Sequence, residues 1–219
     1  MRLQIFVAIT LVVFSAGCGG YFDTGETGTS TPTEVIDEAQ TQTSGRDVSQ
    51  SDRNSTRERL TESELRKVVI SKSDLSGVYE SDGQRTLSPE EASSGTANQF
   101  EQRQLSLIIE RTFTLSDQDN DEPEIIFSSV MQYQSAKAAD TDFERIIDGF
   151  RESDSSVSQQ PVGGITATVV TFENNRGYQN TVYYGKEGSM VFYVVTSDND
   201  RLFKERTKEL FIKMSISIK

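Results

Sequence analysis

The sequence predicts an α+β fold: an antiparallel sheet with helices packed on it, preceded by a disordered tether. Two regions, 105–133 and 165–197, alternate apolar and polar residues and contain turn residues between the runs, as hairpin-connected strands do. Three other segments have the apolar spacing of amphipathic helices. The expected element order from residue 60 onward is roughly α-β-β-α-β-β-β-α.

The first helix is expected to begin just after Leu60. Thr61 and Glu64 have the spacing of a capping box, and Leu60 and Leu65 that of a hydrophobic staple. The apolar stripe of this helix ends near Ser71. Next, residues 78–87 are expected to form a small hairpin around Asp82-Gly83, a favoured turn pair, and residues 89–99 a polar loop.

The clearest strand signals follow, at 105–115 and 125–133, joined by an acidic loop. Ser135 is a candidate N-cap for the next helix. The apolar face of that helix is Ala136, Ala139, Phe143, Ile146, Ile147 and Phe150.

Three further strands are expected at 165–172, 178–186 and 189–197, with turns at 174–177 and 185–188. Asp198 or Asn199 is the candidate cap of a final helix. The apolar side of this helix is Leu202, Phe203, Leu210, Phe211 and Met214.

Residues 1–17 have the three parts of a secretory signal: a positive start with Arg2, an apolar stretch at 3–14, and small residues before Cys18. The apolar stretch is shorter than the roughly 20 residues that a spanning helix needs, and no second stretch of its length follows. The mature chain is therefore expected to have no transmembrane helix.

Ala16-Gly17-Cys18, followed by Gly19, resembles the lipobox of prokaryotic lipoproteins, although Ser15 stands where that pattern usually has Leu. The resemblance implies that the sulfur of Cys18 carries a lipid, which would anchor the protein to the outer face of the cell membrane. The alternative is a secreted protein in which Cys18 is incidental.

Residues 18–59 are rich in Ser, Thr, Gly, Gln and acidic residues, so they are expected to form a lipid-anchored flexible linker. A coil of this length has an average reach of roughly 35 Å. Asn54 begins an Asn-Ser-Thr sequon and is a possible glycosylation site. Residues 60–219 are expected to form a single extracytoplasmic domain.

The chain is strongly acidic, with a formal net charge of −12. Such a surface repels nucleic acid, so nucleic-acid binding is not expected. The composition resembles that of proteins from salt-loving archaea, which implies a halophilic source; an acidic secreted protein is the plainer reading. With one cysteine in the whole sequence, no intramolecular disulfide forms.

The segment from Val162-Gly163-Gly164-Ile165 through Met190-Val191-Phe192-Tyr193 to the final helix is similar to a domain of extracellular prokaryotic lipoproteins that often reads VGDEA. More distantly, the element order resembles the Mog1/PsbP-like fold. Gly164-Ile165 departs from the acidic pair of that pattern. The resemblance implies a fold and no assigned activity.

The sequence contains no histidine, the commonest general base and transition-metal ligand, so no catalytic residue, metal or cofactor is predicted. The acidic loop 117–122 resembles the start of a calcium loop, but Glu122 stands where such a loop needs glycine. Asp140 and Asp142 are interpreted as first-turn helix residues, and no cleft is evident that would pair them as glycosidase acids.

Tyr183, Tyr184 and Tyr193 are the candidate ligand contacts, with ordinary sheet packing as the plainer reading. Strand alternation places Tyr183 and Tyr184 on opposite faces of the sheet. The expected function is a non-catalytic binding or accessory domain with an envelope or transporter protein as partner. The alternatives are a carboxylate-dependent envelope hydrolase and a structural envelope protein.

Overall fold

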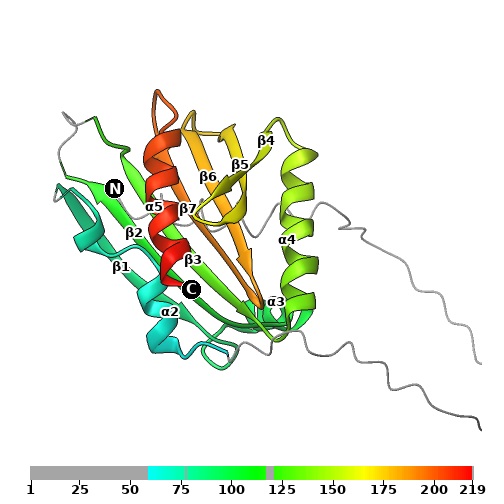
Figure 1. Ribbon diagram of the computed structural model, residues 1–219. Helices are drawn as coiled ribbons and strands as arrows, with labels where there is room; N and C mark the ends of the chain where they lie inside the picture. The colour runs from blue at the N-terminus through cyan, green and yellow to red at the C-terminus, as the bar shows by residue number, and fades with distance from the viewer. Residues whose placement is uncertain (1–58, 77, 117–120, 219) are drawn as a thin grey trace, which may run out of the picture.

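The computed structural model describes residues 59–76, 78–116 and 121–218, which form a seven-stranded sheet with helices on both faces (Figure 1). The strand order is β1-β2-β3-β7-β6-β5-β4, and every neighbouring pair is antiparallel. The α+β fold class is therefore confirmed. In chain order the elements are α2 (Glu62–Val68), a 3-10 turn (Lys72–Asp74), β1 (Tyr79–Leu87), α3 (Ser94–Arg103), β2 (Leu105–Leu115), β3 (Ile125–Tyr133), α4 (Ala136–Arg151), β4 (Ser156–Val162), β5 (Ile165–Glu173), β6 (Gln179–Glu187), β7 (Met190–Asp198) and α5 (Lys204–Ser217).

The sheet separates two apolar cores. Helices α2 and α5 pack on one face, and α3 and α4 pack on the other. Because side chains alternate along a strand, neighbours such as Ile108 and Ile109 enter different cores. We call the two sides the α5 face and the α4 face.

Helix α2 begins with the predicted capping box. The Thr61 N–H donates to Glu64 Oε2 at 2.7 Å, and the Glu64 N–H donates to Thr61 Oγ1 at 3.3 Å. The segment after the helix is hydrogen-bonded to the sheet at Ile70. Its N–H donates to Ser128 Oγ at 3.2 Å, and its carbonyl accepts from Arg111 Nη1 at 3.2 Å.

The predicted hairpin at 78–87 is wrong, because this segment is the single edge strand β1. It pairs with β2 from Tyr79 opposite Leu115 to Leu87 opposite Ile108, with Asp82 left out of the register. The register shifts between Ser81 and Gly83, and Gly83 has φ +114°. The turn-like pair therefore forms a bulge within one strand instead of a reversal.

The predicted loop at 89–99 is wrong in its second half, where α3 begins at Ser94. This helix buries a single large side chain, Phe100, so its sequence has little apolar periodicity. It ends at Gln104, which has φ +52°.

Strand β4 was not expected, because Ser156–Val162 is mostly polar and exposed. Its structure comes from pairing with β5 across a two-residue turn, Gly163-Gly164. The signal for this strand is therefore a partner 3 to 15 residues along the chain (from Val162 opposite Ile165 to Ser156 opposite Thr171), which local periodicity does not reveal.

Helix α5 begins at Lys204, later than predicted, and neither Asp198 nor Asn199 caps it. Asp198 is the last residue of β7, where its carboxylate accepts from the Glu124 and Asp200 N–H groups at 3.3 and 3.2 Å. Leu202 and Phe203 therefore precede the helix. Leu210, Phe211 and Met214 are buried on the α5 face as predicted.

The turn at 174–177 is confirmed, with the Gly177 N–H donating to the Asn174 carbonyl at 2.9 Å. The turn predicted at 185–188 is placed differently, since Gly185 lies within β6 and the reversal is Gly188-Ser189. No helix among the described residues is long and apolar enough to cross a membrane.

Candidate functional site

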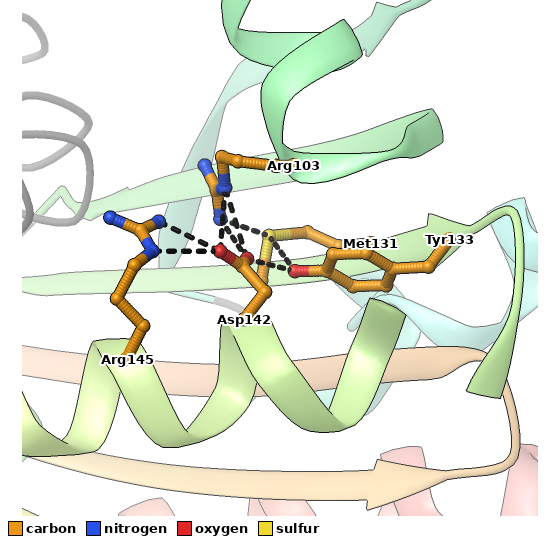
Figure 2. Close-up of polar contacts among 5 residues, drawn as sticks. All are labelled: Arg103, Met131, Tyr133, Asp142 and Arg145. Carbon is orange, nitrogen blue, oxygen red and sulfur yellow. Dashed lines mark hydrogen bonds and ion pairs between the residues drawn. The ribbon is translucent and has the colours of Figure 1, made fainter. Parts of the chain in front are cut away.

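A buried ionic cluster lies on the α4 face, where α3, α4 and the end of β3 meet (Figure 2). It consists of Arg103, Met131, Tyr133, Asp142 and Arg145, and we call it the Asp142 cluster. Arg103 is the last residue of α3, and Asp142 and Arg145 lie one turn apart on α4. One carboxylate therefore joins α3 to β3 and α4, and Arg103 lies 39 residues before Asp142.

The side chains of Arg103, Tyr133 and Arg145 all donate hydrogen bonds to the Asp142 carboxylate. Arg103 donates from Nη2 to Oδ2 at 2.6 Å and from Nε to both oxygens at 3.0 and 3.1 Å. The Tyr133 hydroxyl donates to Oδ2 at 2.5 Å, and Arg145 donates from Nη2 to Oδ1 at 2.7 Å. The sulfur of Met131 lies 3.6 Å from Arg103 Nη2 and 3.7 Å from the Tyr133 hydroxyl.

Asp142 is held ionised. Burial acts to raise its pKa, but the hydrogen bonds and positive charge of Arg103, with help from Tyr133 and Arg145, hold the pKa below its usual value. Burial and the charge of Asp142 raise the pKa of Tyr133. The Asp142 carboxylate is therefore an acceptor that ties α3 to α4, and it is unsuited to donate a proton.

A row of polar side chains crosses the middle of the same face. The strand register places Arg85, Glu110, Ser129, Tyr193 and Tyr184 side by side on β1, β2, β3, β7 and β6. All but Arg85 are buried. Polar side chains at inward positions are unusual, because burial removes their hydration.

Glu110 is the titratable group of this row that responds near neutral pH. Its side chain is 5% exposed, and burial raises its pKa to about 7, while the charge of Arg85 opposes the shift. Two other members of the row, Ser129 on β3 and Tyr184 on β6, have side-chain oxygens with no hydrogen-bond partner among the described residues. The row thus has more hydrogen-bonding capacity than the described protein groups use.

The three candidate tyrosines are all buried, at 0–2% exposure. Tyr183 lies on the α5 face, where its ring is 5.7 Å from Phe211 and its hydroxyl accepts from Gln160 at 2.7 Å. Tyr184 and Tyr193 lie on the α4 face, with ring centroids 4.9 Å apart. The predicted split between faces is confirmed, and all three rings serve as packing groups.

Other sequence predictions fall at or beyond the limits of the described chain. Cys18 and Asn54 lie outside the described residues, as do the first four residues of the acidic loop 117–122. The described end of that loop is paired with arginines, Asp121 with Arg201 and Glu122 with Arg206. No group of three potential metal ligands occurs among the described residues.

Asp140 and Asp142 lie on α4 as expected, but the first-turn interpretation is wrong, because the helix begins at Ala136 and its first turn has no acidic residue. Their roles also differ. Asp140 forms an ion pair with Lys186 at the surface, whereas Asp142 is the centre of the buried cluster. Sequence reasoning missed Arg103 because it lies between the predicted loop 89–99 and the strand from Leu105, where no element was predicted. Sequence reasoning also missed Glu110, because the apolar alternation of this strand falls on odd-numbered residues and both faces of the sheet are buried.

Comparisons with known proteins bear on the fold of this chain. No family model matches the chain, and no curated protein matches it. Among solved structures, the chain is similar to the extracellular domain of PknH from Mycobacterium tuberculosis, at 10% sequence identity and a TM-score of 0.52, over 73% of this chain and 96% of that one. At this identity the match establishes a shared fold.

Proposed function

We propose that the protein is a lipid-anchored extracytoplasmic protein whose folded domain binds or assists other envelope components without catalysing a reaction. The observation that carries the proposal is Cys18, the one cysteine of the chain, placed directly after an apolar run and small residues. Residues 19–58 then provide a polar spacer between this anchor and the domain.

The fold comparison supports the extracytoplasmic part of the proposal. The PknH domain that shares this fold is an extracellular domain, and almost its whole length corresponds to this chain. The extracellular location of that domain and its nearly complete overlap with this chain are consistent with a domain that lies outside the membrane.

The Asp142 cluster supports a non-catalytic role over a carboxylate-dependent hydrolase. Such a hydrolase needs one carboxyl group that donates a proton and a second that acts as base or nucleophile. Asp142 is saturated by two arginines and a tyrosine, and its lowered pKa opposes proton donation.

The anchor is tested by mass spectrometry of the mature amino terminus after expression in a prokaryotic host with lipoprotein processing. We expect a chain beginning at Cys18 with a thioether-linked lipid, and partition of the intact protein into the detergent phase. The Cys18→Ser variant should lose both properties while keeping the same circular dichroism spectrum. A mature chain beginning at another residue would overturn the proposal.

The binding role is tested separately by cross-linking on native membranes, followed by purification through a C-terminal tag. Enrichment of the same envelope protein with wild type, and its absence from a tagged control that lacks the folded domain (residues 60–219), would support the role. Turnover of envelope glycans or peptides by the purified protein would contradict it.

A further inference from the structure

The two edge strands of the sheet differ in how they are protected against pairing with another strand. β1 includes Glu80, Asp82 and Arg85 and is interrupted by the bulge at Gly83. Charges, bulges and edge prolines are the usual devices that block an open sheet edge. β4, Ser156–Val162, has no charged residue and pairs with β5 without a register shift, and its one device of this kind is Pro161 near its end.

The turn after β4 determines which of its backbone groups face outward. Gly163 and Gly164 have φ +60° and +81°, which is the type I′ combination. In such a turn the flanking residues, Val162 and Ile165, form a hydrogen-bonded pair. Hydrogen-bonded and non-bonded pairs alternate along an antiparallel ladder, so Ser156, Ser158, Gln160 and Val162 direct their backbone groups to β5.

Val157, Gln159 and Pro161 therefore direct their backbone groups to the open side. Proline has no N–H, and this position explains why Pro161 is tolerated within the strand. The open edge consequently offers two N–H donors, from Val157 and Gln159, and three carbonyl acceptors. No described strand pairs with this side of β4.

We propose that β4 is a self-association edge, which pairs antiparallel with β4 of a second copy about a two-fold axis at Ser158. In this register Val157 of one copy lies opposite Gln159 of the other, and both donors on both copies are used. Moving the axis by one residue to Gln159 would place Val157 opposite Pro161 and would leave a carbonyl without a donor. Of these two registers, the one centred on Ser158 leaves fewer backbone groups of the edge without a hydrogen-bond partner.

Charge does not oppose a second copy at this edge, because β4 has no charged residue. The chain has a formal net charge of −12, so two copies repel each other over most approaches. Across the proposed pair, Ser156 lies opposite Gln160 and Asp154 lies opposite Val162, so no carboxylate faces another directly. One strand edge buries less than a standard interface of about 1,600 Å², so we expect weak, reversible association.

The register is tested by disulfide trapping in the full chain. The variant Cys18→Ser removes the single native thiol, and Ser158→Cys then introduces one at the two-fold axis. Opposed residues of a non-hydrogen-bonded pair have Cα atoms about 4.5 Å apart, within the range of a disulfide. We expect a covalent dimer under mild oxidation, at least tenfold more than with Ser81→Cys on the exposed β1 edge.

Sedimentation equilibrium over a wide concentration range provides the second test. Ser158→Lys should weaken dimerisation at least tenfold by placing two positive charges on the axis, whereas Glu80→Lys on β1 should not weaken it. Circular dichroism verifies that both variants fold. A monomer at all concentrations, equal trapping at Ser158 and Ser81, or trapping of a different protein through β4 would overturn the proposal.

Discussion

Ser128 accepts a hydrogen bond from the Ile70 N–H at 3.2 Å, across 58 residues of sequence. The next residue, Ser129, is equally buried on the opposite face of the sheet, beside Tyr193, and no described group lies within hydrogen-bonding distance and angle of its hydroxyl oxygen. Two neighbouring serines on β3 thus have the same exclusion from solvent and opposite hydrogen-bonding states.

This pair predicts opposite responses to the same substitution. Ser128→Ala leaves the Ile70 N–H buried without its acceptor, so it should lower the free energy of unfolding by about 1–3 kcal/mol. Ser129→Ala removes a hydroxyl that has no described partner, so it should be neutral or stabilising. Urea unfolding of both variants measures the difference, and equal losses would contradict the assignment.

Gly185 predicts a steric requirement within β6. A Cβ there would lie 2.6 Å from Phe192 Cζ, 2.7 Å from Phe211 Cζ and 2.8 Å from Ile165 Cδ1. The stacked Phe192 and Phe211 rings, 5.2 Å apart, leave little room to move. Gly185→Ala should therefore lower the free energy of unfolding by about 1–3 kcal/mol through overpacking.

Gly95 in α3 is the matched control for this substitution, because a Cβ there would meet no atom within 4 Å. Gly95→Ala should be neutral or slightly stabilising, since alanine favours a helix over glycine. A loss of stability at Gly95 equal to that at Gly185 would contradict the steric explanation.

These contacts show what the sequence could reveal. Five strands and two helices were predictable, because the residues of each show strand alternation or a helix cap with helical apolar spacing. They are β2, β3, β5, β6, β7, α2 and α4. β1 as a single strand, β4 and α3 were not predictable, because they form through pairing with β2, pairing with β5, and burial of Phe100. Local signals do not record such tertiary support.

The same limit applies to the candidate site. The sequence marked tyrosines as candidates by residue type, and the structure shows those rings packed in the two cores. Arg103 and Asp142 are 39 positions apart, and only the docking of α3 beside α4 brings them together. A buried ion pair between two helices has no signature in either helix alone.

Asp142 predicts a strong dependence of stability on its charge. Asp142→Asn leaves Arg103 buried without its carboxylate partner and should lower the free energy of unfolding by about 3–5 kcal/mol. Asp148→Asn is the matched control on the same helix, because Asp148 pairs with Arg151 at the exposed surface and should lose less than about 1 kcal/mol. Chemical denaturation at pH 7 measures both, and similar losses would contradict the buried role.

The pKa of Asp142 also gives a direction with pH. Its folded-state pKa is lowered, so its stabilising contribution is present above the unfolded-state value of about 4 and is lost as the pH falls through the lowered value. Wild type should therefore lose more stability in acid than Asp142→Asn does, relative to each protein at pH 7.

Glu110 predicts the opposite pH dependence. Its folded pKa is about 7, raised from 4.5 by burial, so the folded state retains a proton that the unfolded state releases between these values. Stability should therefore fall as the pH rises from about 4.5 to 7, by about 3 kcal/mol in all. The charged or titratable groups around Glu110 and its neighbour Tyr193 are Arg85 from β1 and Arg103 from α3. Arg85 limits the rise in the Glu110 pKa, because its positive charge favours the ionised carboxylate.

Glu110→Gln isolates this effect, because glutamine keeps the shape of the side chain and does not titrate. Urea unfolding at constant salt from pH 5 to 8 should show wild type losing stability relative to Glu110→Gln, with a slope near 1.4 kcal/mol per pH unit below pH 7. Glu80→Gln on the exposed β1 edge should follow wild type. Since Asp142 acts in the acid range and Glu110 toward neutral pH, parallel curves for wild type and Glu110→Gln would show that the Glu110 carboxyl is hydrated in the folded state.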